Sequence, residues 1–197
     1  MKIYCMGDSI TFGSGLKDPS KRFSDLVAQD TGCEMINCGI GGDTTTGMLS
    51  RLHAQVFSQK PDALVFFGGV NDINLTGEYR IPCANVVSVI VQAKAFGVPL
   101  FVGVPLPIEP QDMPVRAWDI DRDYQRTRWL LRKYAHFITH FCEGRADVHL
   151  VDFRTPFLNE NGDARRELFV DGIHPNEAGH RIMADILGAE IKKVFSL

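Results

Sequence analysis

Met6-Gly7-Asp8-Ser9-Ile10-Thr11-Phe12-Gly13 gives the first indication of the fold. The residues from 2 to 6 form a short apolar run that predicts a strand, and Gly7 ends it just before a serine. The carboxyl ends of parallel strands border a crevice, and open α/β sheets place their reactive groups there. A serine in such a turn, taken alone, is more readily explained as a helix cap or turn residue. The rest of the sequence must therefore show what could activate Ser9.

The same order of strand, glycine-containing loop and helix repeats along the chain. Further strands are predicted at residues 34–38, 63–67, 99–104 and 148–151, and apolar residues at helical spacing fill the segments between them. Predicted helices end near Gly32, Val56, Gly97 and Gly144, and a last helix opens at Pro175. This pattern predicts one domain over residues 1–197. Its expected fold class is α/β: a three-layer α/β/α sandwich with a five-stranded parallel sheet in the flavodoxin-like order 2-1-3-4-5.

Three segments depart from this alternation. The segment from Pro105 to Asp119 contains four prolines, so we predict a long surface loop there. The segment from Asp72 to Arg80 is also interpreted as a loop, and the polar segment from Phe153 to Val170 is predicted to be irregular. Long loops at strand ends often carry function, so the first two segments are the expected sources of substrate preference.

Composition and charge exclude several classes of function. The 197 residues carry 21 Lys and Arg against 24 Asp and Glu, and the resulting net charge of -3 predicts no nucleic-acid partner. No apolar run approaches the roughly 18 residues that a membrane span needs, so we expect no stable membrane association. A cytoplasmic location is expected unless a signal peptide has been removed. The sequence does not specify an oligomeric state.

The cysteine and histidine patterns predict no metal and no cofactor. The five cysteines are odd in number and form no Cys-x-x-Cys pair, which argues against a disulfide framework and against a thiolate zinc site. His174 and His180 are six residues apart, where a zinc-binding helix spaces its histidines by four. We therefore expect the cysteines to be mostly buried apolar residues.

Four polar clusters fall at predicted strand ends or just before the last helix. They contain Ser9, Gly42, Asn71 and the turn Asp171-Gly172-Ile173-His174. A serine hydroxyl needs a base to remove its proton, and a histidine oriented by a carboxylate is the common solution. His174 and Asp171 could supply that pair. The Ser9 and Gly42 N–H groups and the Asn71 amide are candidate donors to an oxyanion.

These residues resemble the four signature blocks of the GDSL/SGNH hydrolases. The blocks are Gly-Asp-Ser near the amino terminus, Gly42, Gly69-Val70-Asn71-Asp72, and Asp171-Gly172-Ile173-His174, in the family's order over nearly the whole chain. The resemblance implies the SGNH hydrolase fold and a serine esterase or lipase with a catalytic triad of Ser9, His174 and Asp171. It also implies an oxyanion hole of Ser9, Gly42 and Asn71. Ile10 stands where the family name has leucine, which is a conservative change. We interpret Asp8, Asp43 and Asp72 as hydrogen-bonding supports for the loops.

Two other classes of function remain open at this point. A metal-dependent phosphoesterase could use Asp8, Asp43, Asn71, Asp72 and His174 as ligands, although no dense ligand motif is present. A binding module could hold a phosphate-bearing ligand such as a flavin in its glycine-rich loops, although neither loop has the spacing of a known phosphate-binding motif.

The expected substrate is a small-molecule ester. A carboxylic ester with a short acyl group, including a carbohydrate O-acetyl ester, fits a domain without an amphipathic lid. A thioesterase or lysophospholipase of the same family is the alternative. The candidate substrate-binding residues are Ile73, Trp118 and Ile173, and the tryptophan could stack on a sugar ring or pack its own loop.

Overall fold

A computed structural model describes residues 1–113 and 123–197 of the chain, and all five of its strands belong to one parallel sheet. The strands are β1 (Lys2–Gly7), β2 (Glu34–Gly39), β3 (Ala63–Phe67), β4 (Leu100–Gly103) and β5 (His149–Val151). Their order is β2-β1-β3-β4-β5, so the predicted order 2-1-3-4-5 is confirmed. β1 lies between β2 and β3, with Ile3 opposite Met35 of β2 and Ala63 of β3.

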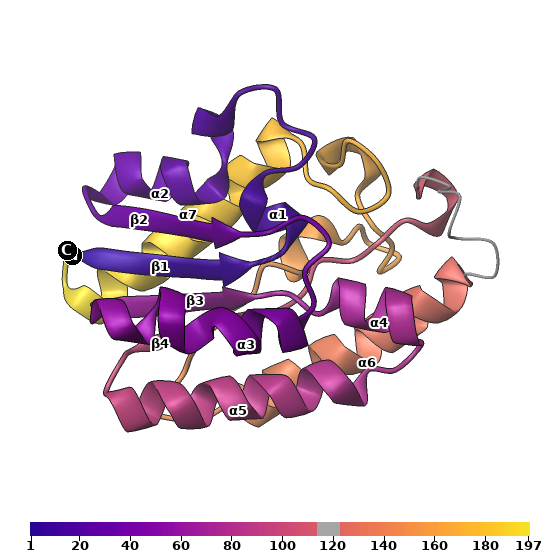
Figure 1. Ribbon diagram of the computed structural model, residues 1–197. Helices are drawn as coiled ribbons and strands as arrows, with labels where there is room; N and C mark the ends of the chain where they lie inside the picture. Colours follow the sequence, from indigo (N-terminus) through magenta and orange to yellow (C-terminus); the bar gives the residue numbers. More distant parts are fainter. Residues whose placement is uncertain (114–122) are drawn as a thin grey trace.

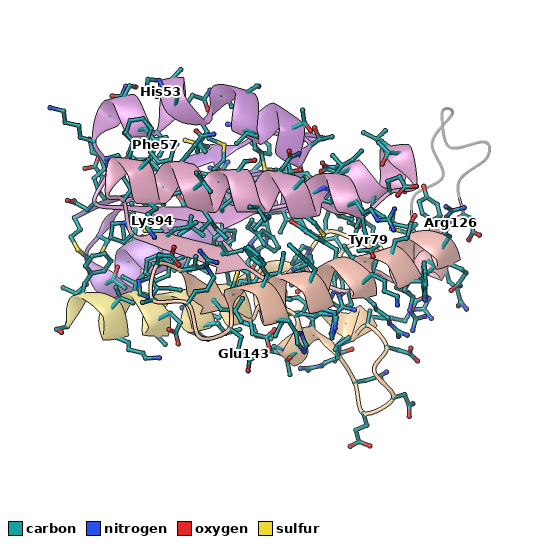
Figure 2. All side chains as sticks on the ribbon, turned by 90° about the horizontal axis from the view of Figure 1, so that it is seen from below. His53, Phe57, Tyr79, Lys94, Arg126 and Glu143 are labelled. Atoms are coloured by element: carbon teal, nitrogen blue, oxygen red, sulfur yellow. The ribbon has the colours of Figure 1, made fainter. Side chains whose placement is uncertain are left out.

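Helices cover both faces of this sheet, as Figure 1 shows. The α-helices are α1 (Ser9–Phe12), α2 (Phe23–Thr31), α3 (Thr45–Gln55), α4 (Val70–Thr76), α5 (Arg80–Phe96), α6 (Tyr124–Cys142) and α7 (Glu177–Phe195). Short 3-10 helices are η1 (Pro19–Lys21), η2 (Phe57–Gln59), η3 (Pro110–Asp112), η4 (Thr155–Phe157) and η5 (Arg166–Leu168). α5 and α6 run side by side over one face of the sheet (Figure 2). α2 and α7 pack against each other on the opposite face. No helix among the described residues is long and apolar enough to cross a membrane.

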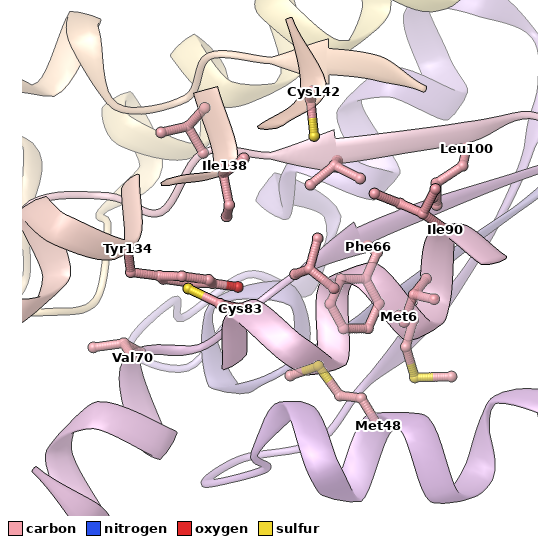
Figure 3. Close-up of a cluster of buried hydrophobic side chains, with 14 of the residues drawn as sticks. Met6, Met48, Phe66, Val70, Cys83, Ile90, Leu100, Tyr134, Ile138 and Cys142 are labelled. Atoms are coloured by element: carbon pink, nitrogen blue, oxygen red, sulfur yellow. The ribbon is translucent and has the colours of Figure 1, made fainter. Parts of the chain in front are cut away.

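Strand residues alternate between two hydrophobic cores, because successive side chains of a strand point to opposite faces of the sheet. Met6 and Phe66 pack with α3, α5 and α6 in one core, part of which Figure 3 shows. Ile3, Val65 and Phe67 pack with α2 and α7 in the other core. The continuous apolar run of β3 is explained by this burial on both sides.

Most predicted helix ends are confirmed. α2 ends at Gly32 and α5 at Gly97, and both glycines have left-handed backbone angles. Thr44 caps α3 by accepting a hydrogen bond from Gly47 N–H. The last helix begins at Glu177 rather than at Pro175, because Asn176 is its N-cap. All five cysteines are free, and four of them are buried.

Two loop predictions are wrong in part. Most of the segment from Asp72 to Arg80 is helical, since α4 runs to Thr76 and α5 begins at Arg80. The start of the segment from Pro105 to Asp119 is not on the surface either: residues 105–109 are buried, with Leu106 in one core and Ile108 in the other. The predicted irregular segment from Phe153 to Val170 has no α-helix or named strand, but Phe153 and Phe157 anchor it in the core.

Candidate active site

Ser9 lies at the carboxyl end of β1, where the strand passes directly into α1. Asp8 is the N-cap of this short helix and accepts a hydrogen bond from Ile10 N–H at 2.9 Å. Ser9 is therefore the first residue of the helix, and its side chain is almost fully buried. Figure 1 shows α1 at the edge of the sheet toward which the strand arrows point. This is the edge at which the sequence predicts a reactive serine.

A continuous hydrogen-bonded path joins Ser9 to His174 and Asp171. Ser9 Oγ–H donates to His174 Nε2 at 3.0 Å, and His174 Nδ1–H donates to Asp171 Oδ2 at 2.9 Å. We assign this tautomer because an ionised carboxylate can only accept. Two side chains from opposite ends of the sequence, 165 residues apart, therefore lie in direct contact.

Asp171 also organises the turn that carries His174. Its Oδ1 accepts hydrogen bonds from the backbone N–H groups of Ile173 at 2.9 Å and His174 at 2.8 Å. Burial acts to raise the pKa of Asp171, but the hydrogen bonds from His174 and Ile173 together hold it below the usual value. The carboxylate is therefore ionised at neutral pH and stabilises a protonated imidazole.

The segment after β4, residues 105–113, holds this turn in place, and we call it the β4 strap. Glu109 N–H donates to Gly172 O at 2.9 Å, and Gly172 N–H donates to Asp112 O at 3.1 Å. An ion pair between Asp112 and Arg166 links the strap to η5. A Cβ at Gly172 would lie only 2.2 Å from Glu109 O, so the close approach of the two backbones requires glycine.

Gly42 approaches the same strand end from the loop after β2, and Asn71 approaches it from the first turn of α4. Gly42 is exposed with a φ of 77°, and its N–H has no protein partner within the described ranges. Asn71 Nδ2–H donates to Asp43 O at 2.9 Å, which joins α4 to the Gly42 loop and leaves the second amide hydrogen available. Arg51 pairs with Asp43 at 2.8 Å and donates to Gly7 O at 3.1 Å, so the Gly42 loop, and α4 through it, is tied to the end of β1.

Asp72 supports the loops as predicted. Its two oxygens accept from the N–H of Thr45 at 2.8 Å and from the Thr45 hydroxyl at 2.5 Å, which joins α4 to α3. Burial raises the pKa of Asp72 although the hydrogen bonds from Thr45 oppose the rise. Asp43 and Asp72 thus have protein partners, and no group of three His, Cys, Asp or Glu residues in the described part of the chain is arranged to hold a metal ion.

An apolar pocket of about 260 Å³, part of it open to solvent, lies beside this constellation. The pocket is bounded by residues that flank Ser9 and His174 and by the β4 strap: Asp8, Ile10, Phe67, Gly68, Val70, Pro105, Leu106, Pro107, Ile108 and Ile173. Of the candidate substrate contacts, Ile173 therefore lines the pocket. Ile73 is instead buried in the core on α4 and does not line it, because the segment expected to be a loop is helical. Trp118 lies outside the described residues.

The remaining histidines lie elsewhere. His180 is completely buried in α7, where Nδ1 accepts from Phe23 N–H at 3.2 Å and the ring stacks on Phe23. His53 packs near Phe96 at the end of α5, and Figure 2 shows it among the side chains of that helical layer. Neither takes part in the hydrogen-bonded path at Ser9.

Comparisons with known proteins identify the family and the fold of this chain. The model of the GDSL-like lipase/acylhydrolase family matches residues 5–182. A comparison with curated proteins gives no match. Among solved structures, a lipase/acylhydrolase from Enterococcus faecalis is similar at 25% identity and a TM-score of 0.73, over 98% of this chain and 96% of the other. A GDSL-like lipase from Bacteroides thetaiotaomicron VPI-5482 has 23% identity and a TM-score of 0.78, over 98% and 88%. The acetyl xylan esterase AlAXEase has 24% identity and a TM-score of 0.77, over 97% and 100%.

Proposed function

The chain belongs to the GDSL-like lipase/acylhydrolase family and is a carboxylic ester hydrolase, and we propose that it cleaves short-acyl esters through an acyl-enzyme on Ser9. The observation that carries the proposal is the hydrogen-bonded path from Asp171 through His174 to Ser9 Oγ. A nucleophile, a base and a group that orients the base are thereby in contact before any substrate binds.

Acylation begins when Ser9 Oγ attacks the carbonyl carbon of the ester. As the Oγ–C bond forms, the hydroxyl proton passes to His174 Nε2, and the carbonyl electron pair moves onto oxygen. Asp171 stabilises the imidazolium through its bond to Nδ1–H. The Ser9 and Gly42 N–H groups and the Asn71 amide are the donors to the oxyanion, since Ser9 directly follows β1 and hydrogen bonds tie the Gly42 loop and the start of α4 to the end of that strand.

His174 then acts as the acid. The tetrahedral intermediate collapses, the ester C–O bond breaks, and the leaving alkoxide takes the proton from Nε2. Water that loses a proton to His174 attacks the acyl-enzyme next, and a second collapse releases the carboxylic acid and returns the proton to Ser9 Oγ. The cycle needs no cofactor.

The pocket beside Ser9 supports a preference for short acyl groups. The empty space in it, about 260 Å³, includes the part that is open to solvent, so little of it is enclosed. Its lining is apolar apart from Asp8, which suits a methyl or short alkyl group. A thioesterase or lysophospholipase acting on long chains would need more room than this pocket offers. One compared structure is named an acetyl xylan esterase, so acetylated sugars belong among the substrates tested.

Covalent labelling tests the proposed nucleophile. A phosphonate with a p-nitrophenolate leaving group should release one equivalent of nitrophenolate and modify Ser9, as identified by peptide mass spectrometry. Ser9→Ala should remove labelling and ester hydrolysis while leaving circular dichroism unchanged. Labelling of another residue, or turnover near the wild-type level in Ser9→Ala, would remove Ser9 from this role.

A substrate panel tests the acyl preference. Hydrolysis of p-nitrophenyl acetate, butyrate and octanoate, an acyl thioester and an acetylated xylo-oligosaccharide is compared by kcat/KM. We expect the highest value for an acetyl ester and a decline with chain length. A maximum at octanoate would contradict the proposed size limit. Loss of activity in EDTA with recovery on adding a divalent ion would favour a metal-dependent phosphoesterase instead.

A further inference from the structure

Asp8 has a carboxylate oxygen that its structural role does not use. Its Oδ1 accepts from Ile10 N–H and caps α1, but its Oδ2 is buried and has no hydrogen-bond partner in the described part of the protein. The side chain is 0% exposed. A buried polar atom without a partner is costly, and capping a helix of four residues needs only one oxygen.

The surroundings of Asp8 increase the strength of any electrostatic interaction that it makes. It lines the apolar pocket with Val70, Ile108 and Ile173, and Figure 3 shows Val70 within one of the two hydrophobic cores. Apolar walls screen charges far less than water does. A charge on Asp8 is therefore felt strongly by the titratable groups nearby.

Among the described residues, four titratable groups interact electrostatically with Asp8, and His174 is the one whose charge changes in the proposed reaction. The negative charges of Asp72 and Asp43 act on Asp8 from α4 and the Gly42 loop, and each of these carboxylates has its own partner, Thr45 or Arg51. Tyr134 faces it from α6, and burial raises the pKa of that phenol well above its usual value, which keeps it neutral. The β4 strap contributes only apolar and backbone groups to the pocket.

We propose that Asp8 acts through His174: when ionised, its free carboxylate stabilises the positive charge that His174 acquires as Ser9 Oγ gives up its proton. The inference rests on the proposed function, because it needs His174 to be the base. Asp8 forms no bond to the substrate and takes no proton in the cycle. It is a positioning residue, and its charge adds to the stabilisation of the imidazolium that Asp171 supplies.

The protonation of Asp8 makes this role visible in the pH dependence. Burial raises its pKa to about 7; the bond from Ile10 N–H and the positive charge of His174 oppose the rise, while Asp72 and Asp43 add to it. Below pH 7 the carboxyl is neutral and its support of His174 is lost. Above pH 7 it is ionised and the support is present. Because the coupling is reciprocal, ionised Asp8 favours protonated His174 as much as protonated His174 favours ionised Asp8.

The test is the pH profile of Ser9 phosphonylation, a single step that needs His174 but not the natural substrate. For the wild type, the logarithm of the rate should rise around pH 7 with a slope above one, because Asp8 must lose a proton there in addition to the deprotonated base that the reaction requires. Asp8→Asn keeps an oxygen to cap α1 and cannot ionise. It should lower the rate above pH 8 by about tenfold, the equivalent of one pKa unit of coupling, and reduce the slope to one.

Control variants separate the effect of the Asp8 charge from an effect on the structure of the protein. Asp72→Asn removes a nearby carboxylate that has partners on both oxygens; because Asp72 raises the pKa of Asp8, this variant should shift the Asp8 transition to lower pH and leave the rate above pH 8 unchanged. If Asp8→Asn does not fold, Asp8→Ser keeps a capping oxygen and is interpreted in the same way. A wild-type slope of one, or a variant with the wild-type slope and plateau, would overturn the role of Asp8. Failure of the phosphonate to label Ser9 in the wild type would instead overturn the proposed function.

Discussion

We expect Gly172→Ala to lower the rate of catalysis far more than it lowers stability. Gly172 lies where the β4 strap contacts the turn that carries His174. A Cβ at this position would lie 2.2 Å from Glu109 O and 2.7 Å from Met113 N. Both are backbone atoms, so neither can rotate away as the end of a side chain would. The turn must move away from the strap, and His174 moves with it.

The size of the effect follows from these distances. Relieving the contact takes a shift of roughly 1 Å, and misplacing a catalytic group by about 1 Å costs about 10²-fold in rate. The two backbone hydrogen bonds between strap and turn weaken at the same time, each worth about 1 kcal/mol. The expected loss of stability is therefore about 2 kcal/mol, well below the 5–15 kcal/mol typical of a folded domain. The variant should be folded and nearly inactive.

Turnover of p-nitrophenyl acetate at 25 °C and the thermal midpoint together check this expectation. We expect kcat to fall about 10²-fold while Tm drops by about 4–8 °C. Gly188→Ala is the matched control, since its Cβ would come no closer than 3.8 Å to Thr31 Cγ2. That variant should keep its activity and gain about 0.5–1 kcal/mol of stability. A Gly172→Ala enzyme with kcat within threefold of the wild type would show that the strap does not position His174.

Three further outcomes are expected. Asn71→Ala should lower kcat about 10²–10³-fold with little change in KM, because it removes one donor to the oxyanion; an unchanged kcat would exclude that role. Asp171→Asn should retain more turnover than His174→Ala, since losing the orienting group leaves the base in place, and the reverse order would contradict the assigned roles. Burial and the positive charges of Arg22 and His174 lower the pKa of His180 to about 4, against about 6.5 unfolded. On acidification the unfolded chain therefore binds a proton at His180 at a higher pH than the folded chain does. Lowering the pH from 6.5 to 4 should remove about 3 kcal/mol from the free energy of unfolding. Urea unfolding from pH 7 to 4.5 should show a smaller decline in His180→Asn.

The sheet could be predicted because burial on both faces leaves continuous apolar runs such as Ala63–Phe67. Helix ends were equally visible where a glycine with a left-handed backbone stops the helix, as at Gly32. α4 was missed because Asn71, Asp72 and Asn74 are typical of turns. This helix is stabilised by contacts with residues that are distant in the sequence, including the two hydrogen bonds that Thr45 donates to Asp72.

In the site, too, the residues that show a local sequence pattern could be predicted, and the contacts between distant segments could not. Ser9, His174 and Asp171 carry chemistry in their side chains and fall at a strand end or just before the last helix, so their pattern could be recognised. The β4 strap could not, because it holds Gly172 through backbone groups that every residue possesses. The prolines of this segment correctly indicate an irregular backbone, but they do not indicate that the segment is buried. It is buried because Leu106 packs in one hydrophobic core and Ile108 packs in the other. Similarly, no sequence pattern reveals that one oxygen of Asp8 lacks a partner.

The two halves of the polypeptide contribute different parts of the reaction centre. A chain divided at Gly97, between α5 and β4, would leave the hydroxyl of Ser9 on one fragment and the imidazole of His174 on the other. Neither fragment would hold a complete set of reacting groups, so colour from a chromogenic ester would develop only after the fragments reassociate. The same connectivity that brings distant residues together thus provides the basis for a split-enzyme reporter of molecular proximity.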